Sequence, residues 1–192
     1  MPGSPPEAEA PGSKHETGAQ KLWRPEFTWI LDDLAVGGSF PRGAAERIAR
    51  DFGVGTVIDV RLEESDRPEE LAACGLQFLH LPTEDLGAVS QDMLDEGVAF
   101  ARRAAREGRK LLIHCQHGIG RSATVALCVL VDRGHAPLEA LSRAKDAREK
   151  ISPSPRQFEA WAAWLRRRGT GGSAPTFEAF AGVAYRHLRR PA

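Results

Sequence analysis

Apolar residues along the chain fall into short runs that alternate with stretches of helical periodicity. Three runs rich in β-branched residues or leucine predict buried strands, over residues 56–60, 77–81 and 110–114. A shorter apolar piece, residues 34–37, precedes them. Runs this short that lack strict alternation are typical of strands covered on both faces of a sheet.

Stretches of helical character lie between these runs. Pro41 and Gly53 bracket the first predicted helix, because proline suits the first helical turn and glycine the position past the end. Ser90 is a suitable N-cap for a helix that reaches Arg106. Further helices are predicted over residues 121–133, 137–150 and 155–168. The alternation predicts an α/β fold with a central mixed, mostly parallel sheet flanked by helices.

The two ends of the chain differ from its middle. Residues 1–20 are rich in Pro, Gly, Ala, Ser and Glu, which predicts a disordered tail. Residues 21–168 form one predicted domain, which suits a chain of 192 residues. Residues 169–175 are expected to be a flexible link, and residues 176–192 an amphipathic helix that packs on the domain or on a partner.

Composition narrows the range of partners and compartments. Acidic and basic residues balance at 26 each, so neither nucleic acid nor a membrane surface is expected as a partner. Three cysteines without a CxxC pair favour a reducing compartment over a disulfide framework. With no secretory signal and no apolar run of membrane length in the sequence, we expect a cytoplasmic location.

The sequence HCQHGIGRS, residues 114–122, lies between a predicted strand and a predicted helix. Its two glycines permit backbone angles and close approaches that a side chain would block. Several backbone N–H groups and the positive end of the helix therefore point at one place, which suits an anion. The expected phosphate-binding residues are Gln116, His117, Gly118, Ile119, Gly120 and Arg121.

Cys115 lies at the base of this predicted anion site. Because the N–H groups that hold a phosphate also stabilise a thiolate, the pKa of Cys115 is expected below its ordinary value. Arg121, six positions later, can hold two phosphate oxygens with its planar guanidinium. The Ser122 hydroxyl is placed to hydrogen-bond the sulfur as it becomes a leaving group. The loop combines a nucleophile with an oxyanion clamp.

These residues, HCQHGIGRSAT, resemble the HCxxGxxR[ST] signature of the protein tyrosine phosphatase superfamily, closest to its small dual-specificity-like members. The resemblance extends over roughly residues 27–168 and includes the segments FTWILDDLAVGG and VIDVRLEE. It implies a cysteine-dependent phosphatase that needs no metal and no cofactor. The implied substrate is a phosphorylated protein, carrying phosphotyrosine and also phosphoserine or phosphothreonine, or a small phosphate monoester.

The stretch HLPTEDLGAVSQDML, residues 80–94, is expected to be a loop that can close over the site. Members of the family carry an aspartate in this loop, and Asp85, 30 positions before Cys115, is the matching residue for the general acid. Glu84 is the alternative, whereas Asp92 falls inside the following predicted helix. The resemblance implies two steps through a cysteinyl phosphate, with Asp85 first the acid and then the base.

Other polar residues near these segments receive supporting roles. His114 is expected to brace the loop and the thiolate. Gln157 lies near the place where some relatives carry a glutamine that positions water, although a solvated helical glutamine is the simpler reading. Arg61 is expected to tie the end of the sheet to neighbouring loops, and Cys74 and Cys128 to fill packed positions.

A metal site is an alternative interpretation of the histidines and the cysteine in these segments. His80, His114, Cys115 and His117 lack the pairwise spacing of a usual zinc site, so no metal is expected.

Three other functions stay open at this point. An inositol or other small-molecule phosphatase would share the mechanism, but Gln116, His117 and Ile119 stand where inositide-directed relatives use lysines. A phospho-binding module without turnover and a sulfur-transfer or redox protein would use the same anion loop.

Overall fold

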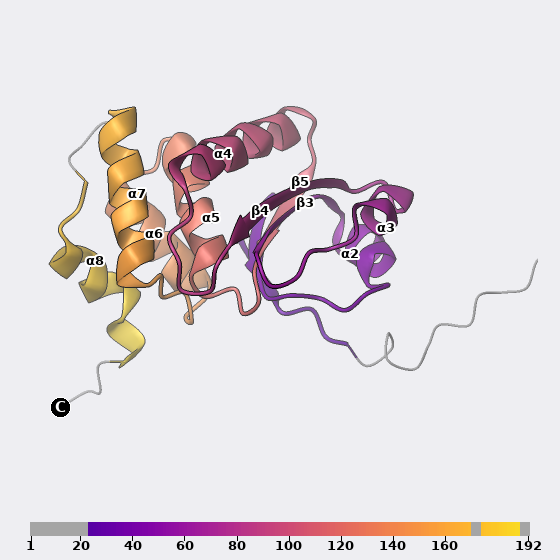
Figure 1. Cartoon of the computed structure of the whole chain (residues 1–192), viewed down its shortest axis with the longest axis horizontal. Helices are drawn as coiled ribbons and strands as arrows, with labels where there is room; N and C mark the ends of the chain where they lie inside the picture. Colours follow the sequence, from indigo (N-terminus) through magenta and orange to yellow (C-terminus); the bar gives the residue numbers. More distant parts are fainter. Residues whose placement is uncertain (1–22, 170–173, 189–192) are drawn as a thin grey trace, which may run out of the picture.

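The computed structural model describes residues 23–169 and 174–188 (Figure 1). Within these residues five strands form one sheet, in the order β1-β2-β5-β3-β4. The strands are β1 (Phe27–Leu31), β2 (Leu34–Gly37), β3 (Val54–Arg61), β4 (Gln77–Thr83) and β5 (Lys110–His114). β1 pairs antiparallel with β2, and the other pairs are parallel. The expectation of a mixed, mostly parallel sheet flanked by helices is confirmed.

Helices cover both faces of this sheet (Figure 1). They are α2 (Ala45–Phe52), α3 (Pro68–Ala73), α4 (Gln91–Arg106), α5 (Arg121–Asp132), α6 (Pro137–Ala147), α7 (Pro155–Arg168) and α8 (Phe177–Ala184), followed by the 3₁₀ helix η1 (Arg186–Leu188). α2 and α3 enclose a smaller apolar core on one face, and α4 to α8 enclose a larger one on the other. None of the helices within the described residues is long and apolar enough to span a bilayer.

The central helix of the larger layer, α5, continues directly from the loop after β5. Every residue of α5 before Asp132 is buried. Because β5 is the middle strand of the sheet, the loop between β5 and α5 is held by packed structure on both sides. This placement restricts the motion of the one segment that carries the candidate cysteine.

Three predicted helix boundaries differ from the structure. The C-terminal helix, predicted over residues 176–192, ends at Ala184, because the backbone angles of −108° and 15° at Tyr185 leave the α-helical range before the 3₁₀ helix η1. The first helix begins at Ala45 rather than Pro41, since Gly43 has a left-handed φ of 79° that a helix does not admit. The helix predicted over residues 137–150 ends at Ala147, because Arg148 has extended backbone angles of −134° and 93°. The elements β1 and α3 lie outside the predicted set.

The C-terminal helix α8 packs beside α6 and α7 (Figure 1). The Thr176 hydroxyl caps it by accepting a hydrogen bond from the backbone N–H of Ala179 at 3.2 Å. Phe180 is fully buried on the domain, whereas Phe177 is exposed. The predicted tail 1–20 lies outside the described residues, as do residues 170–173 of the predicted link and the last four residues of the chain.

Candidate active site

The cysteine loop, residues 115–120, leaves the carboxyl end of β5 and enters α5. Its Gly118 has a φ of 64°, and a Cβ added there would lie 2.4 Å from the backbone carbon of Gly37. Only glycine fits both the left-handed backbone and this close approach. The backbone N–H of Cys115 donates to the Gly37 carbonyl at 3.3 Å, so β2 supports the loop from the side.

Cys115 is 3% exposed, and its Sγ lies 3.3 Å from the Oγ of Ser122. Burial raises the pKa of the thiol, but hydrogen bonds to the sulfur outweigh that effect. These bonds come from the Ser122 hydroxyl and from the backbone N–H groups of Ser122, His117 and Gly118. The pKa of Cys115 is therefore lower than that of an ordinary thiol, which favours a nucleophilic thiolate.

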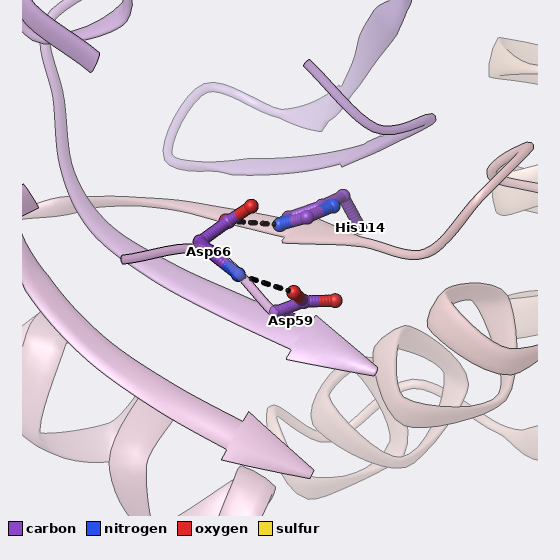
Figure 2. Close-up of side chains that lie close together, drawn as sticks. All are labelled: Asp59, Asp66 and His114. Carbon is purple, nitrogen blue, oxygen red and sulfur yellow. Dashed lines mark hydrogen bonds and ion pairs between the residues drawn. The ribbon is translucent and has the colours of Figure 1, made fainter. Parts of the chain in front are cut away.

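His114, directly before the cysteine, is completely buried. Its Nε2 lies 2.7 Å from the Asp66 carboxylate, and its ring packs on Phe40 at a centroid distance of 4.9 Å. Figure 2 shows Asp66 between His114 at the end of β5 and Asp59 on β3. The carboxylate fixes the imidazole, so the backbone that leads into Cys115 starts from a rigid position. Asp66 was not among the predicted site residues.

Asp59, Asp66 and His114 lie close enough together to be considered as metal ligands. The guanidinium of Arg61 already pairs with Asp59 at 2.9 Å and with Asp66 at 2.8 Å. Burial raises the pKa of Asp59, but the hydrogen bonds with Arg61 and the positive charges of His114 and Arg61 together lower it by more. Arg61 thus supplies the positive charge that these carboxylates need, and it ties β3 to the following turn, which is the role expected for it.

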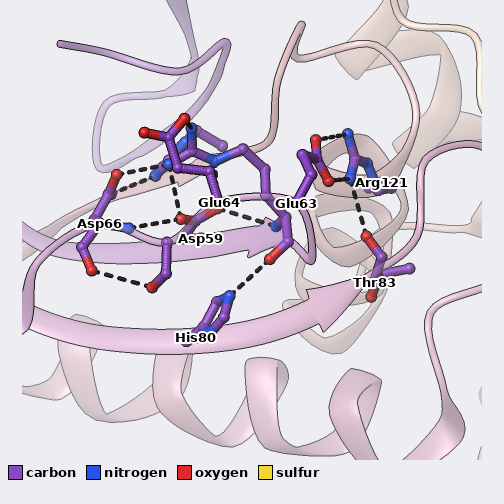
Figure 3. Close-up of polar contacts among 10 residues, drawn as sticks. Asp59, Glu63, Glu64, Asp66, His80, Thr83 and Arg121 are labelled. Atoms are coloured by element: carbon purple, nitrogen blue, oxygen red, sulfur yellow. Dashed lines mark hydrogen bonds and ion pairs between the residues drawn. The ribbon is translucent and has the colours of Figure 1, made fainter.

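Arg121, at the start of α5, is 1% exposed and directs its guanidinium toward the loop after β3 (Figure 3). Its Nη1 and Nη2 donate to the two carboxylate oxygens of Glu63 at 2.7 and 2.8 Å, and Nη1 also donates to the Thr83 carbonyl at 2.9 Å. Its Nε has no partner among the described residues. A buried N–H without an acceptor costs about 1–3 kcal/mol, so an oxyanion beside Cys115 would find a ready donor.

Glu63 is a site residue that the sequence did not reveal. Both of its carboxylate oxygens accept hydrogen bonds from Arg121, and this bidentate pairing fixes the plane of the guanidinium. The hydrogen bond from Arg121 lowers the pKa of Glu63 to about 2. The only signal in the sequence is an acidic pair after the strand in VIDVRLEE, and acidic pairs in turns are common.

The acid loop, residues 84–90, connects β4 to α4 and faces the cysteine loop. Asp85 is 66% exposed, with Oδ1 3.2 Å from the Arg121 Nη2. Glu84 is also exposed and does not line the cavity described next. Asp92 lies in the first turn of α4, where a carboxylate favours the positive end of the helix. Asp85 is thus the carboxylate of this loop that reaches the site.

A cavity of about 100 Å³ opens between the two loops. It is lined by Asp85, Leu86, Cys115, His117, Ile119, Gly120, Arg121, Ser152 and Gln157. Of the predicted phosphate-binding residues, Gln116 and Gly118 do not line it. Their backbones serve the loop instead, since the Gln116 carbonyl accepts from Ser39 at 3.2 Å. The cavity brings together the predicted nucleophile, clamp and acid.

Gln157 is buried, so the simple picture of a solvated glutamine is wrong. Its Oε1 accepts from the backbone N–H of Ser154 at 2.8 Å, and the Ser154 hydroxyl accepts from the backbone N–H of Gln157 at 3.3 Å. This reciprocal pair is a capping box at the start of α7. The amide also lies against Gly120, where an added Cβ would be 2.3 Å from Oε1.

Arg148 is a third buried arginine, after Arg61 and Arg121, and the sequence did not single it out. It lies outside the cavity and donates from Nε to the Gly118 carbonyl at 2.9 Å and from Nη2 to the His117 carbonyl at 3.1 Å. These bonds turn the loop carbonyls away from the cavity, so that N–H groups face the sulfur. Burial lowers the pKa of Arg148, and the Cys115 charge opposes that shift.

Comparison with known proteins gives the same picture as the geometry. The family model "Dual specificity phosphatase, catalytic domain" matches residues 38–166. "Phosphatidylglycerophosphatase and protein-tyrosine phosphatase 1" from Rattus norvegicus is 30% identical over 137 residues, 67% of this chain and 71% of the relative. "Dual specificity protein phosphatase 5" from Homo sapiens is 28% identical over 127 residues, 65% of this chain but 32% of the relative.

Solved structures resemble the whole domain. Tk-PTP in its active form superposes with a TM-score of 0.68 at 29% identity, covering 74% of this chain and 98% of that one. Human DUSP28 superposes with a TM-score of 0.66 at 25% identity, covering 77% and 97%. The chain therefore belongs to the dual specificity phosphatase family and is a cysteine-dependent phosphatase of the protein tyrosine phosphatase type.

Proposed function

We propose that this phosphatase hydrolyses phosphate monoesters at Cys115, with Arg121 as the oxyanion clamp and Asp85 as the general acid and base. The observation that carries the proposal is the buried Cys115 sulfur, whose pKa is lowered by the Ser122 hydroxyl and by surrounding backbone N–H groups. The same cavity is lined by Arg121, whose Nε has no hydrogen-bond partner within residues 23–169 and 174–188. Nucleophile and clamp in this arrangement stabilise the charge that develops on a transferring phosphoryl group.

In the first step the Cys115 thiolate attacks phosphorus in line and forms an S–P bond. The ester P–O bond breaks, and Asp85 gives its proton to the leaving oxygen. Arg121 holds the phosphoryl oxygens through Nε and Nη2 while Glu63 keeps the guanidinium in place. The backbone N–H groups of residues 116–121 bind the remaining oxygens, and a cysteinyl phosphate results.

In the second step water attacks the cysteinyl phosphate. Asp85, now ionised, accepts a proton from the water, and the S–P bond breaks to release inorganic phosphate. The Ser122 hydroxyl, 3.3 Å from the sulfur, stabilises the departing thiolate by donating to it. Gln157 lines the cavity at the right place to orient the water, although its Oε1 is engaged with Ser154, which leaves its amide NH₂ for this role.

For the substrate we propose a phosphorylated protein, with phosphotyrosine preferred and phosphoserine or phosphothreonine also accepted. The family match supports this class. Among the described residues that line the cavity none is a lysine, which disfavours substrates with several phosphates such as inositol polyphosphates. We also place the protein in a reducing compartment such as the cytoplasm, because the three cysteines are free.

A lipid phosphomonoester is the second candidate substrate. One relative is named for phosphatidylglycerophosphatase as well as protein-tyrosine phosphatase activity. Leu86 lines the cavity and is 67% exposed, so it offers an apolar contact at the mouth. Activity on phosphotyrosyl and phosphoseryl peptides should be compared with activity on phosphatidylglycerophosphate in detergent micelles. Higher kcat/KM on the lipid would reverse the proposed order of substrates.

The mechanism is tested with para-nitrophenyl phosphate in the presence of EDTA. We expect metal-independent turnover, lowered by about 10⁴-fold or more in Cys115→Ser and unchanged in Cys74→Ser, a cysteine outside the cavity. Wild-type turnover by Cys115→Ser would remove the mechanism. Binding of a phosphopeptide without any turnover would indicate a phospho-binding module, and cyanide-dependent sulfur transfer from thiosulfate would indicate a sulfurtransferase.

A further inference from the structure

The connector between α6 and α7, residues 148–154, supports both loops of the site. Besides the two carbonyl contacts of Arg148, the backbone N–H of Ser152 donates to the Ile119 carbonyl at 2.9 Å. The Ser154 hydroxyl donates to the Leu86 carbonyl in the acid loop at 2.9 Å. The connector is thus bonded to the cysteine loop and to the acid loop within seven residues, and its position affects both.

The other side of the connector is held by the C-terminal segment, residues 174–188. The hydroxyl of Tyr185, just after α8, donates to the Pro153 carbonyl at 2.6 Å. The Ser152 hydroxyl donates to the Ala184 carbonyl at 3.3 Å. Both contacts fall on residues 152–153 of the connector. The bonds from the connector to the two loops come from Ser152 and Ser154, so the C-terminal segment holds the connector at or beside the residues that support the site.

Lys145, near the end of α6, adds a third link between the same segments. Its side chain is fully buried, and Nζ donates to the Ile151 carbonyl at 2.8 Å and to Nδ1 of His187 at 2.7 Å. Burial, together with the nearby charge of Arg186, lowers its pKa to about 8. One ammonium group therefore joins the connector to η1.

The C-terminal segment is anchored well enough to transmit this restraint. Phe180 is fully buried and packs on Phe158 of α7 at a ring-centroid distance of 4.7 Å, and on Trp161 at 6.1 Å. The segment lies beyond residue 166, where the family match ends. The restraint therefore comes from outside the part of this chain that matches the family.

We propose that Tyr185 is a positioning residue for the phosphatase reaction, which holds the connector, and through it the cysteine loop and the acid loop, in their reactive arrangement. The inference rests on the proposed function of Cys115. Loss of the Tyr185 hydroxyl frees the Pro153 carbonyl and the adjoining Ser152 backbone. The Ile119 carbonyl then loses its fixed donor, so the N–H groups around the sulfur are less well aligned.

The test is Tyr185→Phe in the full chain, which keeps the aromatic ring and removes only the hydroxyl. We expect kcat on para-nitrophenyl phosphate to fall about fivefold with little change in KM, because one hydrogen bond is lost that aligns the transition-state donors. The pH midpoint for alkylation of Cys115 by iodoacetamide should rise by about half a unit. Glu178→Gln, an exposed change in the first turn of α8, is the matched control and should leave both measurements unchanged.

Several outcomes would overturn the proposal. Unchanged kcat and an unchanged alkylation midpoint in Tyr185→Phe would do so, even if its thermal unfolding midpoint fell, since the hydroxyl would then serve packing only. Should Tyr185→Phe fail to fold, His187→Ala decides, because His187 is exposed. His187→Ala removes the hydrogen-bond partner of Lys145 and so weakens the contact between the C-terminal segment and the connector. We expect about a twofold fall in kcat. An unchanged kcat would show that this segment does not position the connector, and it would overturn the proposal.

The alkylation titration separates this inference from the proposed function. If the wild-type chain hydrolyses no phosphate ester but Tyr185→Phe still raises the alkylation midpoint, the positioning of Cys115 stands and the proposed reaction fails. If turnover is present and lost in Cys115→Ser while Tyr185→Phe changes nothing, the reaction stands and the positioning role fails.

Discussion

Cys115 and Arg121 are 3% and 1% exposed, whereas Asp85 on the opposite side of the same cavity is 66% exposed. The cysteine loop is fixed from outside, since Arg148 and the Ser152 backbone bind its carbonyls at residues 117, 118 and 119. Each carbonyl held outside turns an N–H group toward the sulfur. The anion site therefore exists before any substrate arrives.

The acid loop is held more lightly. The connector reaches it through the bond from Ser154 to the Leu86 carbonyl, and the loop closes on itself through the bond from the Gly87 N–H to the Glu84 carbonyl at 3.0 Å. Asp85 makes its 3.2 Å contact with Arg121 from solvent. The difference indicates a division of work, in which attack and charge stabilisation are built in and protonation depends on a loop that can adjust to the leaving group.

The largest effect is expected from a substitution on the fixed side of the cavity, which carries Cys115 and Arg121. Arg121→Lys keeps the charge but removes the fork that serves Glu63 and an oxyanion together, so kcat/KM on para-nitrophenyl phosphate should fall about 10²–10³-fold. Arg133→Lys, on a half-buried arginine that pairs with Asp33 away from the cavity, is the matched control and should keep wild-type activity. A fall of less than tenfold in Arg121→Lys would mean that charge alone, rather than a fixed geometry, holds the phosphate.

The second-largest effect is expected from a substitution in the acid loop. Asp85→Asn should lower kcat about 10²-fold for a phosphate ester with a poorly acidic leaving group, and much less for para-nitrophenyl phosphate, whose phenolate leaves without a proton. The measurement is kcat for aryl phosphates across a range of leaving-group pKa values. Glu84→Gln is the matched control, and a leaving-group dependence in Glu84→Gln instead would identify Glu84 as the acid.

The part of the site that the sequence predicts is the part whose residues are contiguous in the chain. The cysteine loop could be predicted, because its nucleophile, glycines, arginine and serine are contiguous and lie between a strand and a helix that pattern alone defines. Glu63, Asp66 and Arg148 could not, since they contact the loop and its flanks across 58, 48 and 30 positions of chain. A single sequence carries no signal for such pairings. The sheet was predicted in kind, while the edge strand β1 and the short α3 were missed.

A third prediction concerns Glu63, which lies in the turn after β3 and binds Arg121. Glu63→Gln removes the negative charge beside Arg121 and leaves one of the two acceptor oxygens, so kcat/KM should fall about tenfold. The pKa of Glu63 is lowered from 4.5 to about 2 by that bond. The pair therefore stabilises the fold fully above about pH 4.5, and this contribution is lost as the pH falls through about 2.

The unfolding free energies of wild type and Glu63→Gln should accordingly differ near neutral pH and converge toward pH 2. Since Glu63 is 44% exposed, the difference is expected to be small. Glu64→Gln is the control, because Glu64 pairs with Arg61 and not with Arg121. Equal activity of Glu63→Gln and wild type would show that the cysteine loop alone holds the guanidinium.

The smallest effect separates the two loops at the level of the backbone. Leu86 and Gly118 both have left-handed φ values, of 58° and 64°. Leu86→Asn suits that conformation better than leucine and keeps the carbonyl that Ser154 binds, so the unfolding free energy should rise by less than about 1 kcal/mol. Thermal unfolding and kcat should both stay close to wild type, with kcat changed by no more than about twofold.

Gly118→Ala is the counterpart in the cysteine loop. Its Cβ would meet the Gly37 backbone at 2.4 Å, at a cost of about 1–3 kcal/mol, or several degrees in Tm. If both substitutions were equally tolerated, the cysteine loop would not be the rigid partner, and the division of work between the two loops would fail.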